Sequence, residues 1–131
     1  MRTLFSIVKN IMTKISIVIL SYNTKEYLIK ALKSVALVAE KDWEIIVVDN
    51  ASTDGTWETL QEYAASHGVI AVRQDLLGAA RARNYGRRYA SGEILVFVDA
   101  DTTIEPDCLS RIVDHCGIDG MEGGIIRLAG A

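Results

Sequence analysis

Four apolar runs, each followed by a helical pattern, are the feature that most restricts the fold of this chain. The runs are rich in β-branched residues and carry almost no charge, as expected of strands that are covered on both faces. Each is followed by apolar residues at helical spacing. A strand–helix unit repeated in this way predicts an α/β fold with an open, mainly parallel sheet and helices on both faces. The predicted strands are 14–20, 43–48, 69–72 and 93–98, the helices are 27–38, 55–65, 79–90 and 108–115, and a last strand covers 124–128.

Length and composition limit what such a chain does. Its 131 residues, half of them apolar, suffice for one domain with a substantial core. A net charge of −3 and a pI near 5.3 argue against a nucleic-acid partner. No apolar stretch reaches the roughly twenty residues of a membrane helix. Cys108 and Cys116 lack the spacing of a zinc site, and we expect them to be reduced thiols of a cytoplasmic protein. We predict an amino-terminal extension over residues 1–13 and one domain over 14–131.

Polar residues stand directly after the predicted strands. Ser21-Tyr22-Asn23 follow the first, Asp49-Asn50 close the second, Gly78 lies beyond the third, and Asp99-Ala100-Asp101 close the fourth. Since ligands of open parallel sheets bind outside the carboxyl ends of the strands, these side chains are expected on one rim.

The fourth of these segments suits a metal ion. In an extended segment Asp99 and Asp101 project to the same side, and paired carboxylates suit Mg²⁺ or Mn²⁺. Alternatively they are ordinary turn residues, because Asp is common after strands.

Taken in order, four motifs resemble the family 2 glycosyltransferases, whose nucleotide-sugar-binding domain has the GT-A (Rossmann-like) fold. The resemblance covers Lys14 to Val113 and implies that the chain holds only the amino-terminal part of that fold. It implies transfer of a sugar from a nucleotide diphosphate-sugar, usually a uridine one, with inversion and with Mn²⁺ or Mg²⁺ as cofactor. The motifs are Ser21-Tyr22-Asn23 with Tyr27-Leu28, the segment 45–56 that includes Asp49-Asn50-Ala51-Ser52-Thr53-Asp54-Gly55, the segment 82–93 that begins Ala82-Arg83-Asn84-Tyr85-Gly86, and Val98-Asp99-Ala100-Asp101 with Pro106.

The same resemblance implies roles for individual residues. Asp49 is expected to accept a hydrogen bond from the base, and Ser21-Tyr22 to line the base pocket. Asp99 is expected near the ribose, and Asp101, with Asp99, at the metal. Arg83 or Arg81 are candidates for the phosphates, and Glu26 is a weaker candidate. The predicted nucleotide-sugar-binding set is Leu20, Ser21, Tyr22, Glu26, Asp49, Asn50, Gly78, Arg83, Asp99, Ala100 and Asp101.

Several residues of the four motifs also have purely structural interpretations. Asp54-Gly55-Thr56 suits a turn and helix start, Gly86 suits close packing of a helix on the sheet, and Arg83 belongs to a cluster of arginines typical of a solvated face.

No catalytic base is assigned, because Asp114, Asp119 and Glu122 stand in no recognisable motif. The chain is therefore expected to be either the donor-binding part of a transferase or a nucleotide-sugar-binding module without activity of its own. As a transferase part it would be completed by a carboxyl-terminal region or a partner chain, and would act on a saccharide, lipid or protein acceptor. Peripheral association with the inner face of the membrane is compatible with this interpretation.

Overall fold

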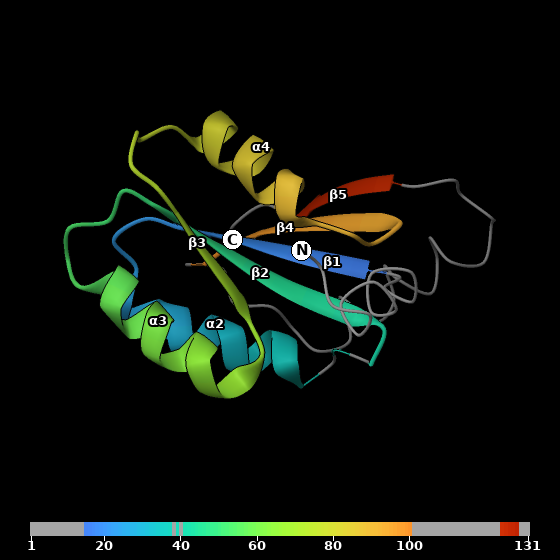
Figure 1. The fold of residues 1–131 in the computed structure, drawn as a ribbon, viewed down its shortest axis with the longest axis horizontal. Helices are drawn as coiled ribbons and strands as arrows, with labels where there is room; N and C mark the ends of the chain where they lie inside the picture. Colours follow the sequence, from blue (N-terminus) through green and yellow to red (C-terminus); the bar gives the residue numbers. More distant parts are fainter. Residues whose placement is uncertain (1–14, 38, 40, 101–123, 129–131) are drawn as a thin grey trace, which may run out of the picture.

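A five-stranded sheet, entirely parallel, forms the centre of the molecule (Figure 1). The computed structural model describes residues 15–37, 39 and 41–100, and the backbone of 124–128. The strand order is β3-β2-β1-β4-β5, so the chain winds outward from β1 in both directions. The strands are β1 (Ile15–Ser21), β2 (Trp43–Asn50), β3 (Ile70–Gln74), β4 (Ile94–Asp99) and β5 (Gly124–Leu128).

Helices lie on both faces of this sheet, as predicted. Helices α2 (Lys25–Ala36) and α3 (Thr56–His67) lie side by side below the sheet in Figure 1, and α4 (Ala79–Tyr89) lies above it. Each helix connects two parallel strands, which is the crossover that parallel pairing requires.

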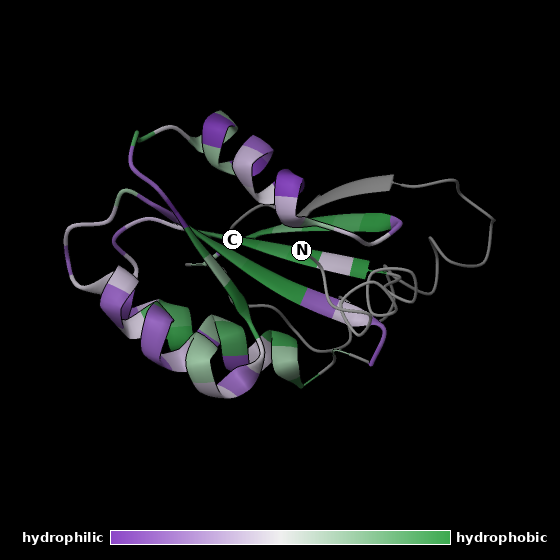
Figure 2. Ribbon diagram, in the orientation of Figure 1, coloured by the Kyte–Doolittle hydropathy of each residue, from purple (hydrophilic) through white to green (hydrophobic). Residues whose placement is uncertain are grey.

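Alternation along the strands divides the core into two layers. Ile15, Ile17 and Ile19 of β1 face α2 and α3, whereas Val18 faces α4. Helix α2 completes the first layer with a stripe of buried residues that includes Leu28 and Leu32. Figure 2 shows the consequence: the central strands are hydrophobic along most of their length, and the outer surfaces of the helices are hydrophilic.

Gly86 sets how closely α4 approaches the sheet. A Cβ atom at this position would lie 2.6 Å from Val18 Cγ1 and 2.9 Å from Val48 Cγ2, closer than side chains tolerate. Only glycine allows the helix to rest directly on β1 and β2. The predicted packing role of Gly86 is thereby confirmed.

The buried carboxylate of Glu44 links the amino-terminal ends of β1 and β2 to the turn before β4. Glu44 Oε2 accepts hydrogen bonds from Ser16 Oγ at 2.5 Å, from the Ser91 backbone N–H at 2.6 Å and from Ser91 Oγ at 2.8 Å. The Gly92 N–H donates to Ser16 Oγ at 2.8 Å. These bonds hold the α4–β4 turn against β1 and β2, at the opposite end of the sheet from the rim predicted to bind ligand.

The predicted elements agree with the structure within the described residues. Every predicted strand and helix between residues 15 and 100 is present, with ends that differ by one or two residues, and the last predicted strand is β5. The predicted extension over 1–13 and the predicted helix over 108–115 lie outside the described residues.

Candidate functional site

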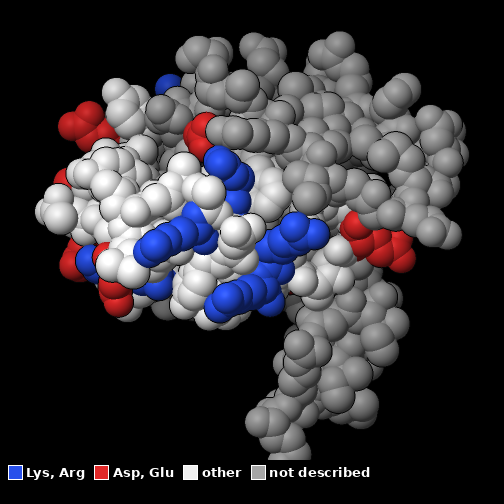
Figure 3. Space-filling model, turned by 90° about the horizontal axis from the view of Figure 1, so that it is seen from above, with Lys and Arg blue, Asp and Glu red and all other residues white. Residues whose placement is uncertain are grey.

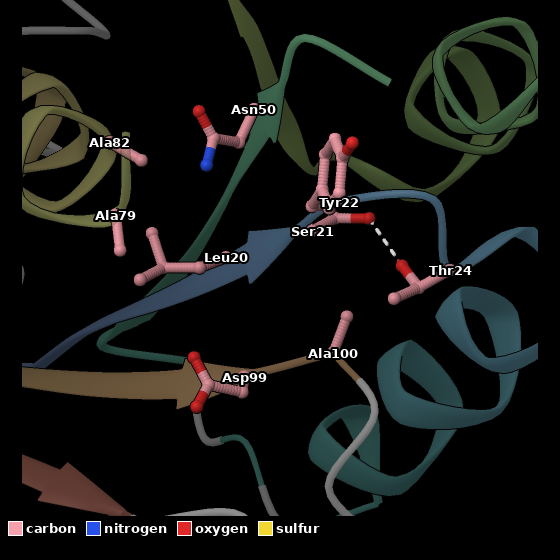
Figure 4. Close-up of a pocket in the computed structure, with 9 residues that line it drawn as sticks. All are labelled: Leu20, Ser21, Tyr22, Thr24, Asn50, Ala79, Ala82, Asp99 and Ala100. Atoms are coloured by element: carbon pink, nitrogen blue, oxygen red, sulfur yellow. Dashed lines mark hydrogen bonds between the residues drawn. The ribbon is translucent and has the colours of Figure 1, made fainter. Parts of the chain in front are cut away.

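A pocket of about 250 Å³ opens at the carboxyl ends of β1, β2 and β4, on the rim that the sequence predicts. Five of its lining residues carry polar side-chain groups, namely Ser21, Tyr22, Thr24, Asn50 and Asp99. Figure 4 shows them around one space, with Asn50 and Tyr22 at one end and Asp99 at the other. The complete lining is Leu20, Ser21, Tyr22, Thr24, Asn50, Ala79, Ala82, Asp99 and Ala100.

Two loops that meet beside the pocket brace each other. Ser21 and Thr24 share a hydrogen bond between their hydroxyl groups at 2.5 Å. The Asn23 backbone N–H donates to Ser52 Oγ at 2.9 Å, and Asn23 Oδ1 accepts from the Thr53 N–H at 2.8 Å. Asn23 has a positive φ of 48°, a conformation that asparagine tolerates better than most residues. The β1–α2 turn is therefore fixed by the loop that follows β2.

Asp49 stabilises that loop from inside. Its side chain is fully buried, and Oδ2 accepts a hydrogen bond from the Ser52 N–H at 3.3 Å and lies 3.9 Å from Arg73 Nε. Asp49 Oδ1 is buried and has no hydrogen-bond partner among the described residues. The residue is not part of the pocket lining, so its predicted contact with the base stays a prediction.

Asn50, by contrast, lies in the lining while it also holds the β3–α4 loop. Its side-chain oxygen accepts from Gln74 Nε2 at 3.1 Å and from the Gly78 backbone N–H at 3.1 Å. Gln74 Nε2 donates in addition to the backbone oxygens of Leu76 at 2.7 Å and Gly78 at 3.4 Å. The Gly78 backbone is thus hydrogen-bonded to a lining residue, Asn50, although Gly78 does not line the pocket itself.

The loop between β2 and α3 is a turn stabilised by Asp54. Asp54 Oδ1 accepts from the Thr56 N–H at 3.0 Å and from the Thr56 hydroxyl, while Oδ2 accepts from the Lys25 N–H at 3.3 Å. Gly55 begins the helix with a φ of 91°, which a residue with a Cβ rarely adopts. The predicted turn and helix start are confirmed. Burial acts to raise the pKa of Asp54, but the bonds from Thr56 and Lys25 outweigh it, and the pKa lies below its ordinary value.

Asp99 is the only carboxylate among the described residues of the lining. The Ala100 N–H donates to the Leu20 oxygen at 2.8 Å, which extends the β1–β4 pairing to Ala100 and places Asp99 beside Leu20. A partly exposed carboxylate at a pocket wall is a hard oxygen ligand of the kind that Mg²⁺ and Mn²⁺ prefer. Asp101 lies outside the described residues, and within them no group of three or more metal-ligating side chains occurs.

Helix α4 contributes a basic surface beside the pocket. Its arginines are Arg81, Arg83, Arg87 and Arg88, and the helix contains no acidic residue. Viewed from above, basic side chains gather in one area of the surface (Figure 3). Arg81 lines a second, more open pocket together with Arg73 and Tyr85, whereas Arg83 is half-buried and lines neither pocket. Glu26 is exposed on α2 and also lies outside the lining.

Three lining residues were not predicted: Thr24, Ala79 and Ala82. The signal for Thr24 is its position just before α2, where a hydroxyl residue is favoured. The two alanines lie in the first turns of α4, where small side chains leave room between helix and sheet.

Comparison with known proteins agrees with this geometry. Residues 16–123 match the family model described as glycosyl transferase family 2. The glycosyltransferase GlyA of Streptococcus pneumoniae serotype 4 is 37% identical over 100 residues, which are 76% of this chain and 14% of GlyA. The chain therefore belongs to glycosyl transferase family 2.

Solved structures agree on the fold. The chain superposes on S. aureus TarS in complex with UDP-GlcNAc with a TM-score of 0.71 and 26% identity, over 81% of this chain and 32% of TarS. It superposes on the mannosyltransferase PcManGT from Pyrobaculum calidifontis, in complex with GDP-Man and Mn²⁺, with a TM-score of 0.73 and 29% identity, over 79% of this chain and 32% of PcManGT. The fold is the GT-A fold, and the chain spans about a third or less of the length of these relatives. Within the described residues no helix is long and apolar enough to span a membrane.

Proposed function

We propose that this chain binds the donor of a metal-dependent, inverting transfer of a sugar from a uridine diphosphate-sugar to an acceptor. The observation that carries the proposal is the pocket at the carboxyl ends of β1, β2 and β4, where an aromatic residue, an amide and a carboxylate surround one space. Family membership and the nucleotide-sugars bound by TarS and PcManGT support a nucleotide-sugar as the ligand, and the UDP-GlcNAc bound by TarS supports a uridine one.

The donor is proposed to lie across the pocket, with its base towards Tyr22 and Asn50 and its ribose towards Asp99. Tyr22 is 47% exposed and offers a ring on which a base can stack. Leu20, Ala79, Ala82 and Ala100 provide an apolar surface for the base and the ribose. The hydroxyl groups of Ser21 and Thr24 bind each other and so keep this wall in place.

Asp99 and Asp101 are proposed to hold Mn²⁺ or Mg²⁺. The ion supplies positive charge for the diphosphate, whose negative charge grows as the bond to the sugar breaks. Without a cation, Asp99 and the diphosphate repel each other, and the chain would bind the donor weakly.

The acceptor and its base complete the proposal. An inverting transfer needs a carboxylate that removes the proton of the attacking hydroxyl group. Among the described residues of the lining only Asp99 is a carboxylate, and it is committed to the donor. We therefore propose that the base, and the binding of a saccharide, lipid or protein acceptor, come from a partner chain or from the part of such transferases that these residues do not cover, since the chain spans about a third or less of its relatives' length. A cytoplasmic location stays a prediction, and so does the separate suggestion of peripheral association with the inner face of the membrane.

Calorimetry of UDP and uridine binding, in Mn²⁺ and in EDTA, tests this proposal. We expect Mn²⁺ to tighten the binding of UDP at least tenfold and to leave uridine unchanged, because only UDP carries the diphosphate. Asp99→Asn should remove most of the gain. Glu93→Gln, which removes an exposed carboxylate just before β4, is the matched control and should keep it. Equal affinity for UDP in Mn²⁺ and in EDTA would refute the metal-dependent donor site.

A further inference from the structure

Helix α4 presents a strongly basic side to the solvent. Arg81, Arg87 and Arg88 are exposed, Arg83 is half-buried, and the helix contains no acidic residue. Both salt bridges among the described residues are made by Arg73, so no described carboxylate pairs with an arginine of α4. Figure 3 looks onto this face of the molecule and shows the basic side chains gathered there. In a chain with a net charge of −3, this surface is a local concentration of positive charge.

The stability of the helix does not explain all of these charges. Arg87 and Arg88 lie in the last turn, where a positive charge stabilises the helix dipole. Arg81 lies in the first turn, where a positive charge is unfavourable, and no acidic residue offsets it there. The basic surface therefore extends from one end of the helix to the other, as expected of a surface that attracts an anionic partner.

Exposed apolar side chains border the basic surface at both ends. Leu76 and Leu77, in the loop that leads into α4, are 64% and 58% exposed, and Tyr89, at the end of α4, is 42% exposed. Leu76 and Arg81 line the same open pocket, so apolar surface and charge are adjacent there. Arginines beside exposed leucine and aromatic side chains suit an anionic lipid bilayer, because the guanidinium groups meet the headgroups while the apolar side chains enter between them.

We propose that the surface formed by Leu76, Leu77, Tyr89 and the arginines of α4 docks this chain onto an anionic lipid bilayer. The inference goes beyond the proposed function, because it concerns where the chain acts and not what its pocket binds. Ala79 and Ala82 of the same helix line the pocket at the carboxyl ends of the strands, so a docked chain holds that pocket beside the bilayer. An acceptor carried by a lipid would then be presented to the proposed donor site.

Co-sedimentation of residues 1–131 with lipid vesicles tests the inference. The vesicles contain phosphatidylcholine alone or phosphatidylcholine with phosphatidylglycerol, which is anionic, and binding is measured at low and at high salt. Arg87→Gln/Arg88→Gln removes two charges from the end of α4 that does not line the pocket. The matched control is Lys30→Gln/Lys33→Gln, which removes two exposed charges from α2, on the other face of the sheet (Figure 1). Thermal unfolding reports whether each variant is folded.

We expect the wild-type chain to bind the anionic vesicles, not to bind the neutral ones, and to dissociate at high salt, which screens the charges. Each basic residue at an anionic surface contributes about fivefold to binding, so Arg87→Gln/Arg88→Gln should weaken it at least about tenfold. Lys30→Gln/Lys33→Gln should leave it unchanged. Leu76→Ser/Leu77→Ser, which alters only exposed loop side chains, should weaken binding as well, whereas Leu37→Ser, at an exposed position after α2, should not.

Failure of the wild-type chain to bind anionic vesicles would overturn the inference and leave the surface to an acidic protein, and this arm needs no variant. Equal losses in the α4 and α2 variants would also overturn it, because net charge and not the α4 surface would then govern binding. Full binding by the folded arginine and leucine variants would assign docking to another surface. UDP binding by the same samples keeps the two proposals apart, since a chain that binds vesicles but not UDP would refute only the proposed function.

Discussion

Asp49 and Asn50, adjacent at the end of β2, have different surroundings because a strand projects successive side chains to opposite faces. Asp49 is enclosed between Ser52 and Arg73 and supports the following loop from inside. Asn50 reaches the pocket and holds Gly78. Asp49 therefore stabilises the loop from inside, and Asn50 lies in the wall of the pocket.

Tyr22 provides a direct test at the residue scale. If its ring stacks on the base, Tyr22→Ala should weaken the binding of both UDP and uridine by about 1–3 kcal/mol, the usual cost of losing one base–aromatic stack. Tyr27→Ala is the control, because Tyr27 is 55% exposed on α2 and lies outside the lining. Calorimetry in Mn²⁺ measures both. Equal effects of the two substitutions would show that Tyr22 does not contact the base.

At the scale of single elements, the start of α3 depends on the charge of Asp54. The pKa of Asp54 is lowered in the folded chain, so the ionised form stabilises the fold above the ordinary pKa of 3.8, and this contribution is lost as pH falls through the lower folded value. Because the side chain is exposed, we expect Asp54→Asn to cost less than about 1 kcal/mol at pH 7. Urea unfolding should show this difference at pH 7 and a smaller difference at pH 3. A difference that does not change with pH would contradict the assignment.

Helix α4 depends on close approach to the sheet. Gly86→Ala would place a methyl group within 3 Å of Val18 and Val48, and we expect it to destabilise the fold by about 1–3 kcal/mol, although alanine favours helices more than glycine does. Asn84→Ala, at an exposed position of the same helix, should cost little. Urea unfolding compares the two. A Gly86→Ala chain as stable as the wild type would mean that α4 does not rest on β1 and β2.

The sequence predicts the features that short segments of the chain determine, and it does not predict those that depend on contacts between distant segments. The strands and helices between residues 15 and 100 were predicted within two residues, because apolar runs and helical spacing are properties of short segments. The rim was predicted because all carboxyl ends of parallel strands lie at one edge. The pairing of Asn50 with Gly78, the burial of Asp49 and the lining role of Ala82 depend on how distant loops meet, and no local pattern encodes them.

For the molecule as a whole, we expect donor binding without efficient transfer. The hydrogen bonds of Glu44 lie at one end of the sheet, and the pocket lies at the other end. Asp99 is the only carboxylate among the described residues that line this pocket. We expect purified residues 1–131 to bind UDP-sugars and to release UDP slowly, with no more than a small acceleration by candidate acceptors, because positioning and general-base catalysis together supply several orders of magnitude in rate. The assay is UDP release from a panel of donors. Strong acceptor-dependent turnover would require a base within this chain.

Binding of the nucleotide at the carboxyl-terminal rim of the sheet is tested most directly by a ¹⁵N–¹H NMR titration of the 14.4 kDa chain with UDP and Mg²⁺. We expect shifts concentrated in the backbone amides of Ser21, Tyr22, Asn50 and Ala100, with the amides of Glu44 and Ser91 at the opposite end unchanged. Shifts centred on the Glu44 end, or confined to the arginines of α4, would contradict it.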